Sequence, residues 1–203
     1  MVKKLKKKSR RKQNRFVLAY KDSWSYLNES RYYFIFVVSL FFLLSLFVFL
    51  GLQNNELNKI VFEQLKEIIL EFEGLNTFQT VLKIFLNNLS AAFFGIFLGL
   101  FFGIFPIMFI LFNSYVVGLV ARMSVDSEGI LVLWQLLPHG IFELPAIFIS
   151  FGLGIKLGMF VFAKNPWKEL QYRFWKSFRV FLLIVLPLLF LAAIIEGILV
   201  VLL

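Results

Sequence analysis

Long apolar stretches, separated by short segments that carry charges and turn residues, dominate the pattern of this chain. Four of them reach or exceed the length of about 20 residues that an α-helix needs to cross the hydrocarbon of a bilayer. They cover about residues 33–52, 89–112, 141–163 and 181–203. The pattern therefore predicts four membrane-spanning helices, of which the last is interrupted by Pro187 and Glu196.

Residues 113–137 follow a less regular pattern. Two short apolar pieces, Tyr115–Ala121 and Ile130–Leu137, flank a polar stretch that contains Arg122 and Asp126. Neither piece is long enough to cross a bilayer alone. Together they form either one irregular crossing buried by its neighbours or a re-entrant hairpin, which is tolerated only inside protein or beside a wet cavity.

A segment of different character, Gln53–Gly74, lies between the first two spans. Its apolar residues recur at helical spacing, and glutamates and lysines fill the opposite face. A helix of this kind between two spans either lies on the outer membrane surface or caps the bundle. We therefore predict an amphipathic interfacial helix between spans 1 and 2.

Composition places the chain in a membrane. It has 203 residues, of which 60% are hydrophobic and 28 are phenylalanine, which is more apolar surface than a soluble domain of this size can bury. Cysteine is absent, which excludes disulfides, thiolate catalysis and cysteine-based metal sites. The predicted fold class is all-α, a polytopic transmembrane helical bundle that forms one domain over residues 33–203.

The positive charge is concentrated at the N-terminus. The net charge is +9, and nine Lys or Arg residues lie between Lys3 and Arg15 without an acid among them. Residues 1–32 are therefore predicted to be a basic cytoplasmic tail, held inside by the positive-inside rule and contacting anionic lipid. A nucleic-acid contact is the disfavoured alternative, because basic runs beside a first span are common.

Charge asymmetry also gives a topology. The basic segment Lys164–Arg179 is predicted to be a cytoplasmic loop, and the acidic residues 53–74 are placed outside. Residues 113–137 must then cross, because a re-entrant hairpin would leave 141–163 starting on the wrong side. The result is a cell-membrane protein with five crossings, a cytoplasmic N-terminus and a C-terminus outside. Lys156 is expected to snorkel toward the end of its span.

Glycines recur every fourth residue in two of the spans, and this spacing lets helices approach closely. The helix-packing residues predicted from it are Gly95, Gly99, Gly103, Gly154 and Gly158. A packing partner within the chain is favoured over a second copy, which leaves a homo-oligomer open. Pro106 is expected to kink the second span.

A few polar residues fall inside the predicted spans, and the expected polar cluster consists of His139, Glu143, Glu196, Asn87, Asn88 and Asn113. His139 and Glu143 are four residues apart and share one helix face. Counting about 1.5 Å per residue from Lys164 and from Arg179 places Glu143 and Glu196 at similar depth, roughly 25–32 Å from the cytoplasmic boundary. The predicted cluster lies near the outer leaflet.

Three roles are open for these residues. They tie helices together by hydrogen bonds, they form a pathway for a proton, ion or small solute, or they form a catalytic or metal centre. The third role has the least support, because the chain has one histidine and no cysteine and lacks nucleophile-elbow and phosphate-loop motifs. We predict no metal, no cofactor and no enzymatic activity.

The same residues carry a family resemblance over roughly Thr77–Leu203. The matching features are Asn87-Asn88, the glycine-rich second span, Asn113 with Gly118, Pro138-His139-Gly140-x-x-Glu143-x-x-Ala146, Gly154-x-x-x-Gly158 and Ala193-x-x-Glu196. In these positions the chain resembles the stage II sporulation protein M family. The resemblance implies a multi-pass membrane protein that, in spore formers, anchors and scaffolds peptidoglycan-degrading partners.

Two functions follow from these observations. The leading prediction is an integral membrane scaffold or anchor that recruits protein partners at the membrane. The alternative is a transporter or channel for a proton, cation or small solute, in which His139, Glu143 and Glu196 bind the transported species.

Overall fold

The computed structural model describes residues 15–202, apart from the side chains at positions 135–139 and 196–202. Within this range the chain forms helices joined by short turns. The α-helices are α2 (Arg15–Glu29), α3 (Arg31–Phe49), α4 (Asn55–Phe72), α5 (Thr77–Phe97), α6 (Ile104–Glu128), α7 (Leu133–Gly158), α8 (Pro166–Val180) and α9 (Leu186–Leu202). Short 3-10 segments cover Leu98–Leu100, Ile130–Val132 and Met159–Phe162, and a π-helical segment covers Phe181–Val185.

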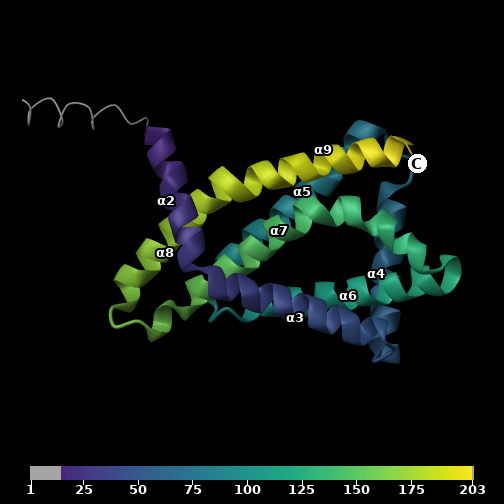
Figure 1. The fold of residues 1–203 in the computed structure, drawn as a ribbon, viewed down its shortest axis with the longest axis horizontal. Coiled ribbons are helices and arrows are strands. Elements are labelled where there is room, and N and C mark those ends of the chain that lie inside the picture. The colour runs from purple at the N-terminus through teal and green to yellow at the C-terminus, as the bar shows by residue number, and fades with distance from the viewer. Residues whose placement is uncertain (1–14, 203) are drawn as a thin grey trace, which may run out of the picture.

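Five of the described segments are long and apolar enough to cross a membrane. They are Arg31–Phe49, Thr77–Leu100, Ile104–Glu128, Gly140–Phe162 and Pro166–Ile195. The long helices run along the longest axis of the molecule, and α2 and α4 lie across opposite ends of this bundle (Figure 1). We call these ends the α2 end, which also holds α8, and the α4 end. The predicted all-α bundle with five membrane-length helices is confirmed.

The boundary between the second and third of these helices differs from the prediction. The predicted span 89–112 is wrong, because the first helix ends at Leu100 and α6 begins at Ile104. Phe102 (φ 57°) and Gly103 (φ 72°) both adopt left-handed backbone conformations, which reverse the chain. Bulky residues rarely adopt positive φ, so a turn made from Phe-Gly carries no polar signal in the sequence.

Two further predictions change with this boundary. Pro106 is the third residue of α6 and belongs to its first turn, where a missing N–H is tolerated, so the predicted kink is not formed. Residues 113–137 are not one irregular crossing, because they comprise the second half of the regular helix α6, the turn at Gly129 (φ 84°) and the start of α7. The Arg122–Asp126 pair (2.7 Å) is an ion pair within the last turns of α6.

Two segments expected to lack regular structure are helical. The predicted basic loop 164–179 is mostly helix α8, which begins at Pro166 and continues through the π-helical segment into α9. The predicted tail 1–32 includes α2, and its residues 1–14 lie outside the described residues. Proline at a first helical position is compatible with helix formation, which explains the start of α8.

The predicted helix between the first two spans is present as α4. Asn54 caps its N-terminus by accepting hydrogen bonds from the backbone N–H groups of Glu56 (2.9 Å) and Leu57 (3.1 Å). Val61 is buried and packs with Val48 of α3 and Leu119 of α6. The position of α4 at a membrane interface stays a prediction.

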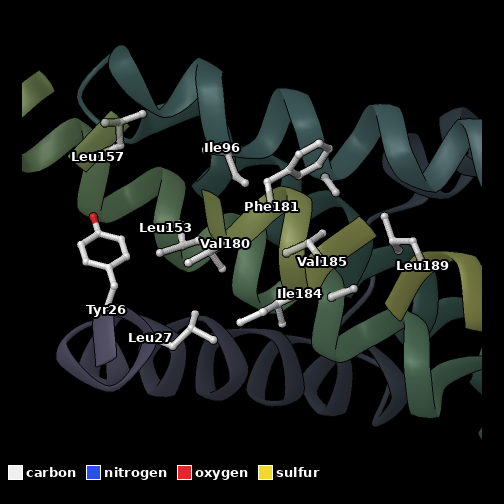
Figure 2. Packing of buried hydrophobic residues seen from close by; sticks show 12 residues of the cluster. Tyr26, Leu27, Ile96, Leu153, Leu157, Val180, Phe181, Ile184, Val185 and Leu189 are labelled. Atoms are coloured by element: carbon white, nitrogen blue, oxygen red, sulfur yellow. The ribbon is translucent and has the colours of Figure 1, made fainter. Parts of the chain in front are cut away.

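Helix α7 is the centre of the packing. It contacts α3, α5, α6 and α9, and it is the most buried of the five membrane-length segments. Its residues Leu153 and Leu157 belong to the main apolar cluster (Figure 2). This cluster also contains Ile96 of α5, Val180 of α8 and Val185 of the π-helical segment. Every other membrane-length helix is therefore positioned against α7.

Candidate functional site

Glycine-mediated contact between the end of the second span and the second half of α7 holds the bundle together near its α2 end. A Cβ added to Gly99 would lie 2.6 Å from the Cα of Gly154, and one added to Gly158 would lie 2.7 Å from the carbonyl carbon of Phe102. Real Cβ atoms do not approach other atoms so closely, so the two backbones touch without room for side chains. The structure thus brings Gly95 of α5 and Gly99 of the following 3-10 segment against the glycines of α7 within one chain.

The same contacts define a register. Gly95 meets Phe151 and Gly154, and Gly99 meets Gly154 and Gly158, so the two segments run parallel with an offset of 55–59 residues (154 − 99 = 55, 158 − 99 = 59). Position 88 is therefore level with positions 143–147. By backbone register, Asn88 and Glu143 lie within about one helical turn of each other in height.

Residue Glu196 lies at a different height. Ring contacts of Phe85 with Phe190 and of Phe93 with Phe181 show that α5 and the last helix run antiparallel. In this register Glu196 is level with residue 79, which is nine residues from position 88, or about 13 Å at 1.5 Å per residue. The depth count from sequence assumed that Lys164 and Arg179 lie at one level, but 164 precedes α8 and 179 is near its end.

The described asparagines of the predicted cluster have different surroundings. Asn88 is 9% exposed, whereas Asn87 and Asn113 lie on the surface of the bundle. The Asn113 side-chain amide donates to the carbonyl of Phe109 in its own helix (2.7 Å). Glu143 is half-buried. The side chains of His139 and Glu196 lie outside the described ones, so the six-residue cluster stays a prediction.

A second polar site, which sequence analysis did not identify, lies at the α2 end. Lys156 of α7 is only 9% exposed, so it does not snorkel outward as expected. Its Nζ donates to the Ser30 hydroxyl (2.8 Å) and lies 3.8 Å from the centre of the Tyr26 ring. Hydrogen bonding and a cation–π contact compensate for burial of the ammonium group, which is why it can stay inside. We call Tyr26, Ser30 and Lys156 the Lys156 cluster.

Local backbone structure positions the two partners of Lys156. Ser30 is the single residue between α2 and α3, is fully buried, and donates its hydroxyl proton to the Tyr26 carbonyl (2.7 Å). Tyr26 is 1% exposed and packs edge-to-face on Tyr172 of α8. Burial raises the pKa of the Tyr26 phenol well above its usual value, so the ring faces Lys156 as a neutral phenol.

Ion pairs extend this site onto α8. Arg173 donates to the backbone carbonyl of Lys156 and, through Nε, to Glu169 (2.8 Å). Asp22 of α2 pairs with both Lys176 and Arg179. The hydrogen bond from Lys176 holds the pKa of the Asp22 carboxyl below its usual value, against the opposing effect of partial burial.

The site at the α2 end can hold helices and bind anions, and it offers no set of metal ligands. Within the described residues, no group of three or more His, Cys, Asp or Glu side chains could hold a metal ion. The one signal in the sequence was a single lysine inside an apolar stretch. Its partners could not be inferred, because Ser30 lies 126 positions away along the chain.

Comparison with known proteins agrees with the resemblance seen in the sequence. Residues 34–200 match the model of the family described as Stage II sporulation protein M, and this range covers all five membrane-length segments except the first three residues of the first. No curated protein and no solved structure matches the chain. The family assignment therefore rests on the family model and is confirmed by its extent.

Proposed function

Because this chain belongs to the stage II sporulation protein M family, we propose that it is a membrane anchor whose rigid bundle presents α2 and α4 as docking surfaces for partner proteins. The observation that carries this proposal is the contact between Gly99 and Gly154, where two backbones touch in the half of the bundle near the α2 end. A transport route through the α5–α7 interface would need that contact to open.

The distribution of pockets on the surface supports the same function. One described pocket lies on α8, and two others lie where α6 meets α4 and the turn before it. These positions are near the two ends, and the middle of α7 is covered, since Ala146 and Phe148 are buried. A protein that holds partners needs accessible ends and a packed middle, which is the arrangement observed.

Charge supports an orientation. Helix α8 and the segment before α2 are basic, whereas α4 carries Glu56, Glu63, Glu67 and Glu71. By the positive-inside rule, the proposed orientation puts the α2 end in the cytoplasm and the α4 end outside. The chain has no cysteine, so single cysteines report this directly. In intact cells, a membrane-impermeant maleimide should label Lys66→Cys on α4 and leave Lys21→Cys on α2 unlabelled until the cells are opened.

Ion flux distinguishes the anchor from the alternative transporter. Liposomes that contain the purified protein should pass protons and monovalent cations no faster than protein-free liposomes. Glu143→Gln and the surface control Glu63→Gln should both leave this background unchanged. Flux above background that Glu143→Gln abolishes, while the unfolding temperature stays near that of the wild type, would show that the transporter is correct and the anchor proposal wrong.

A further inference from the structure

A shallow pocket on α8 combines cations with exposed aromatic rings. It has a volume of about 300 Å³ and is lined by Lys168, Gln171, Tyr172, Trp175, Lys176 and Arg179. These positions are three or four residues apart, so they form one stripe along the helix. The opposite stripe of α8 packs into the bundle through Leu170, Phe174 and Val180. We call this feature the α8 pocket.

The charge of the α8 pocket is positive after its ion pairs are counted. Lys168, Lys176 and Arg179 contribute three positive charges, and Asp22 contributes one negative charge to the latter two (3 − 1 = +2). The nearby Glu169 is paired with Arg173, which faces the bundle. An anion that enters the pocket therefore meets excess positive charge without displacing the Asp22 contact.

The aromatic residues of the pocket are held in place. Trp175 is 63% exposed, yet its ring contacts the rings of Phe174 and Phe178 edge-to-face. Tyr172 lies under Nζ of Lys176 at 5.4 Å from the ring centre. Exposed Trp and Tyr residues beside an apolar span are typical of the headgroup layer of a bilayer, where a ring is partly in lipid and partly in water.

Apolar surface continues from the pocket along the chain. Leu182, three residues after Arg179, is exposed, as are Phe190 and Leu191 of α9. A ligand that has a phosphate at one end and hydrocarbon at the other would match both surfaces at once. Free phosphate would use only the cationic part.

We propose that the α8 pocket binds the phosphate-bearing headgroup of an anionic phospholipid, with its acyl chains along α9. This rests on the proposed function only in that the bundle is embedded in lipid; it does not need partner proteins or a particular orientation. Lys168 and Arg179 attract the headgroup, and Trp175 covers its glycerol region. The bound lipid then covers the membrane-facing side of α8 at the α2 end.

Native mass spectrometry of the full chain in a neutral detergent tests the proposal. Phosphatidylglycerol should remain bound more than phosphatidylcholine, and Lys168→Gln should lower phosphatidylglycerol retention about fivefold, as expected for one basic residue at a lipid surface. Lys66→Gln on α4 makes the same change in net charge and should leave retention unaltered. Equal retention by the two variants would overturn the proposal, as would displacement of the lipid by millimolar inorganic phosphate.

A second measurement locates the lipid. Brominated phosphatidylglycerol quenches tryptophan fluorescence on contact, so Trp175→Phe should remove more of the quenching than Trp134→Phe at the α4 end. If both changes remove the same share, the lipid is not at the α8 pocket. Neither measurement involves ion flux, so a failure here leaves the anchor proposal standing, and flux through the wild type would leave the lipid site standing.

Discussion

The two ends of the bundle are closed by crossing helices that are attached in different ways (Figure 1). At the α2 end, α2 is fixed by the Lys156 cluster and by the Asp22 ion pairs. At the α4 end, α4 rests on a small apolar contact around Val61 and on the Tyr115 hydroxyl, which accepts from the Asn54 N–H (2.9 Å) and donates to Asn58 Oδ1 (2.7 Å). A more exposed ion pair joins Glu71 of α4 to Lys83 of α5 (2.7 Å).

The two crossing helices differ in how easily each can move. A buried cation must keep its partners, because the loss of one leaves an uncompensated charge inside the protein, and this makes α2 rigid. Helix α4 has one fully buried residue, and its other side chains are half-buried or exposed, so local release costs little. We therefore expect α2 to move as part of the bundle and α4 to separate from it more easily.

Removal of the contact between Gly99 and Gly154 should release both α2 and α4 at once, and this is the largest expected effect. Gly154→Leu places a side chain where the backbone of Gly95 and Gly99 lies, so α5 and α7 cannot pack. The variant should fail to elute as a monodisperse species in size-exclusion chromatography. Gly140→Ala is the control, because its Cβ would meet only the flexible Leu144 side chain (3.2 Å). A monodisperse Gly154→Leu with a wild-type unfolding temperature would contradict the packing.

At the α2 end, Tyr26→Leu should lower the free energy of unfolding by about 2–4 kcal/mol, because it removes a buried ring and the cation–π partner of Lys156. Thermal unfolding followed by tryptophan fluorescence measures the change. Tyr20→Leu on the same helix is exposed and should stay within about 0.5 kcal/mol of the wild type. Equal effects of the two substitutions would show that the Lys156 cluster does not hold α2.

At the α4 end, Val61→Ala should cost about 2 kcal/mol locally, because it removes buried methyl groups from the contact with Val48 and Leu119. The effect should be confined to α4. Hydrogen exchange should therefore speed up in residues 55–72 while exchange in α7 stays unchanged. Faster exchange throughout the bundle would mean that α4 is as firmly integrated as α2, and the contrast between the ends would disappear.

Hydropathy predicted much of this fold because the length of an apolar helix is fixed by bilayer thickness, which is a local property of sequence. The helix boundaries within residues 98–132 were not predictable in this way. The turn at Phe102 and Gly103 is itself apolar, so its position depends on packing against Ile155 and Gly158 of α7 rather than on turn residues.

The candidate site was predictable only in part for a related reason. A sequence shows that Lys156 stands alone in an apolar stretch, but it does not show that Ser30 and Tyr26 will reach it from another helix. Depth counting failed for Glu196 because the charged residue used as a boundary, Arg179, belongs to a helix that continues beyond it. Pairings between distant segments are set by helix register, which composition does not encode.

The smallest expected effect concerns the Asp22 ion pairs. The folded pKa of Asp22 is lowered chiefly by its hydrogen bond from Lys176, so its contribution to stability is fully present above the unfolded pKa of about 3.9 and is lost as the pH falls through the folded pKa. Because the pairs are partly exposed, the gain should be about 1 kcal/mol or less.

The measurement compares unfolding temperatures of the wild type and Asp22→Asn at several pH values. The wild type should be the more stable at pH 7, and the gap should close as the pH falls well below 3.9, because the protonated carboxyl and the amide are then alike in charge. Asp126→Asn, which removes an exposed pair within α6, is the matched control and should change little. A gap that persists in acid would mean that the charge of Asp22 does not hold α2.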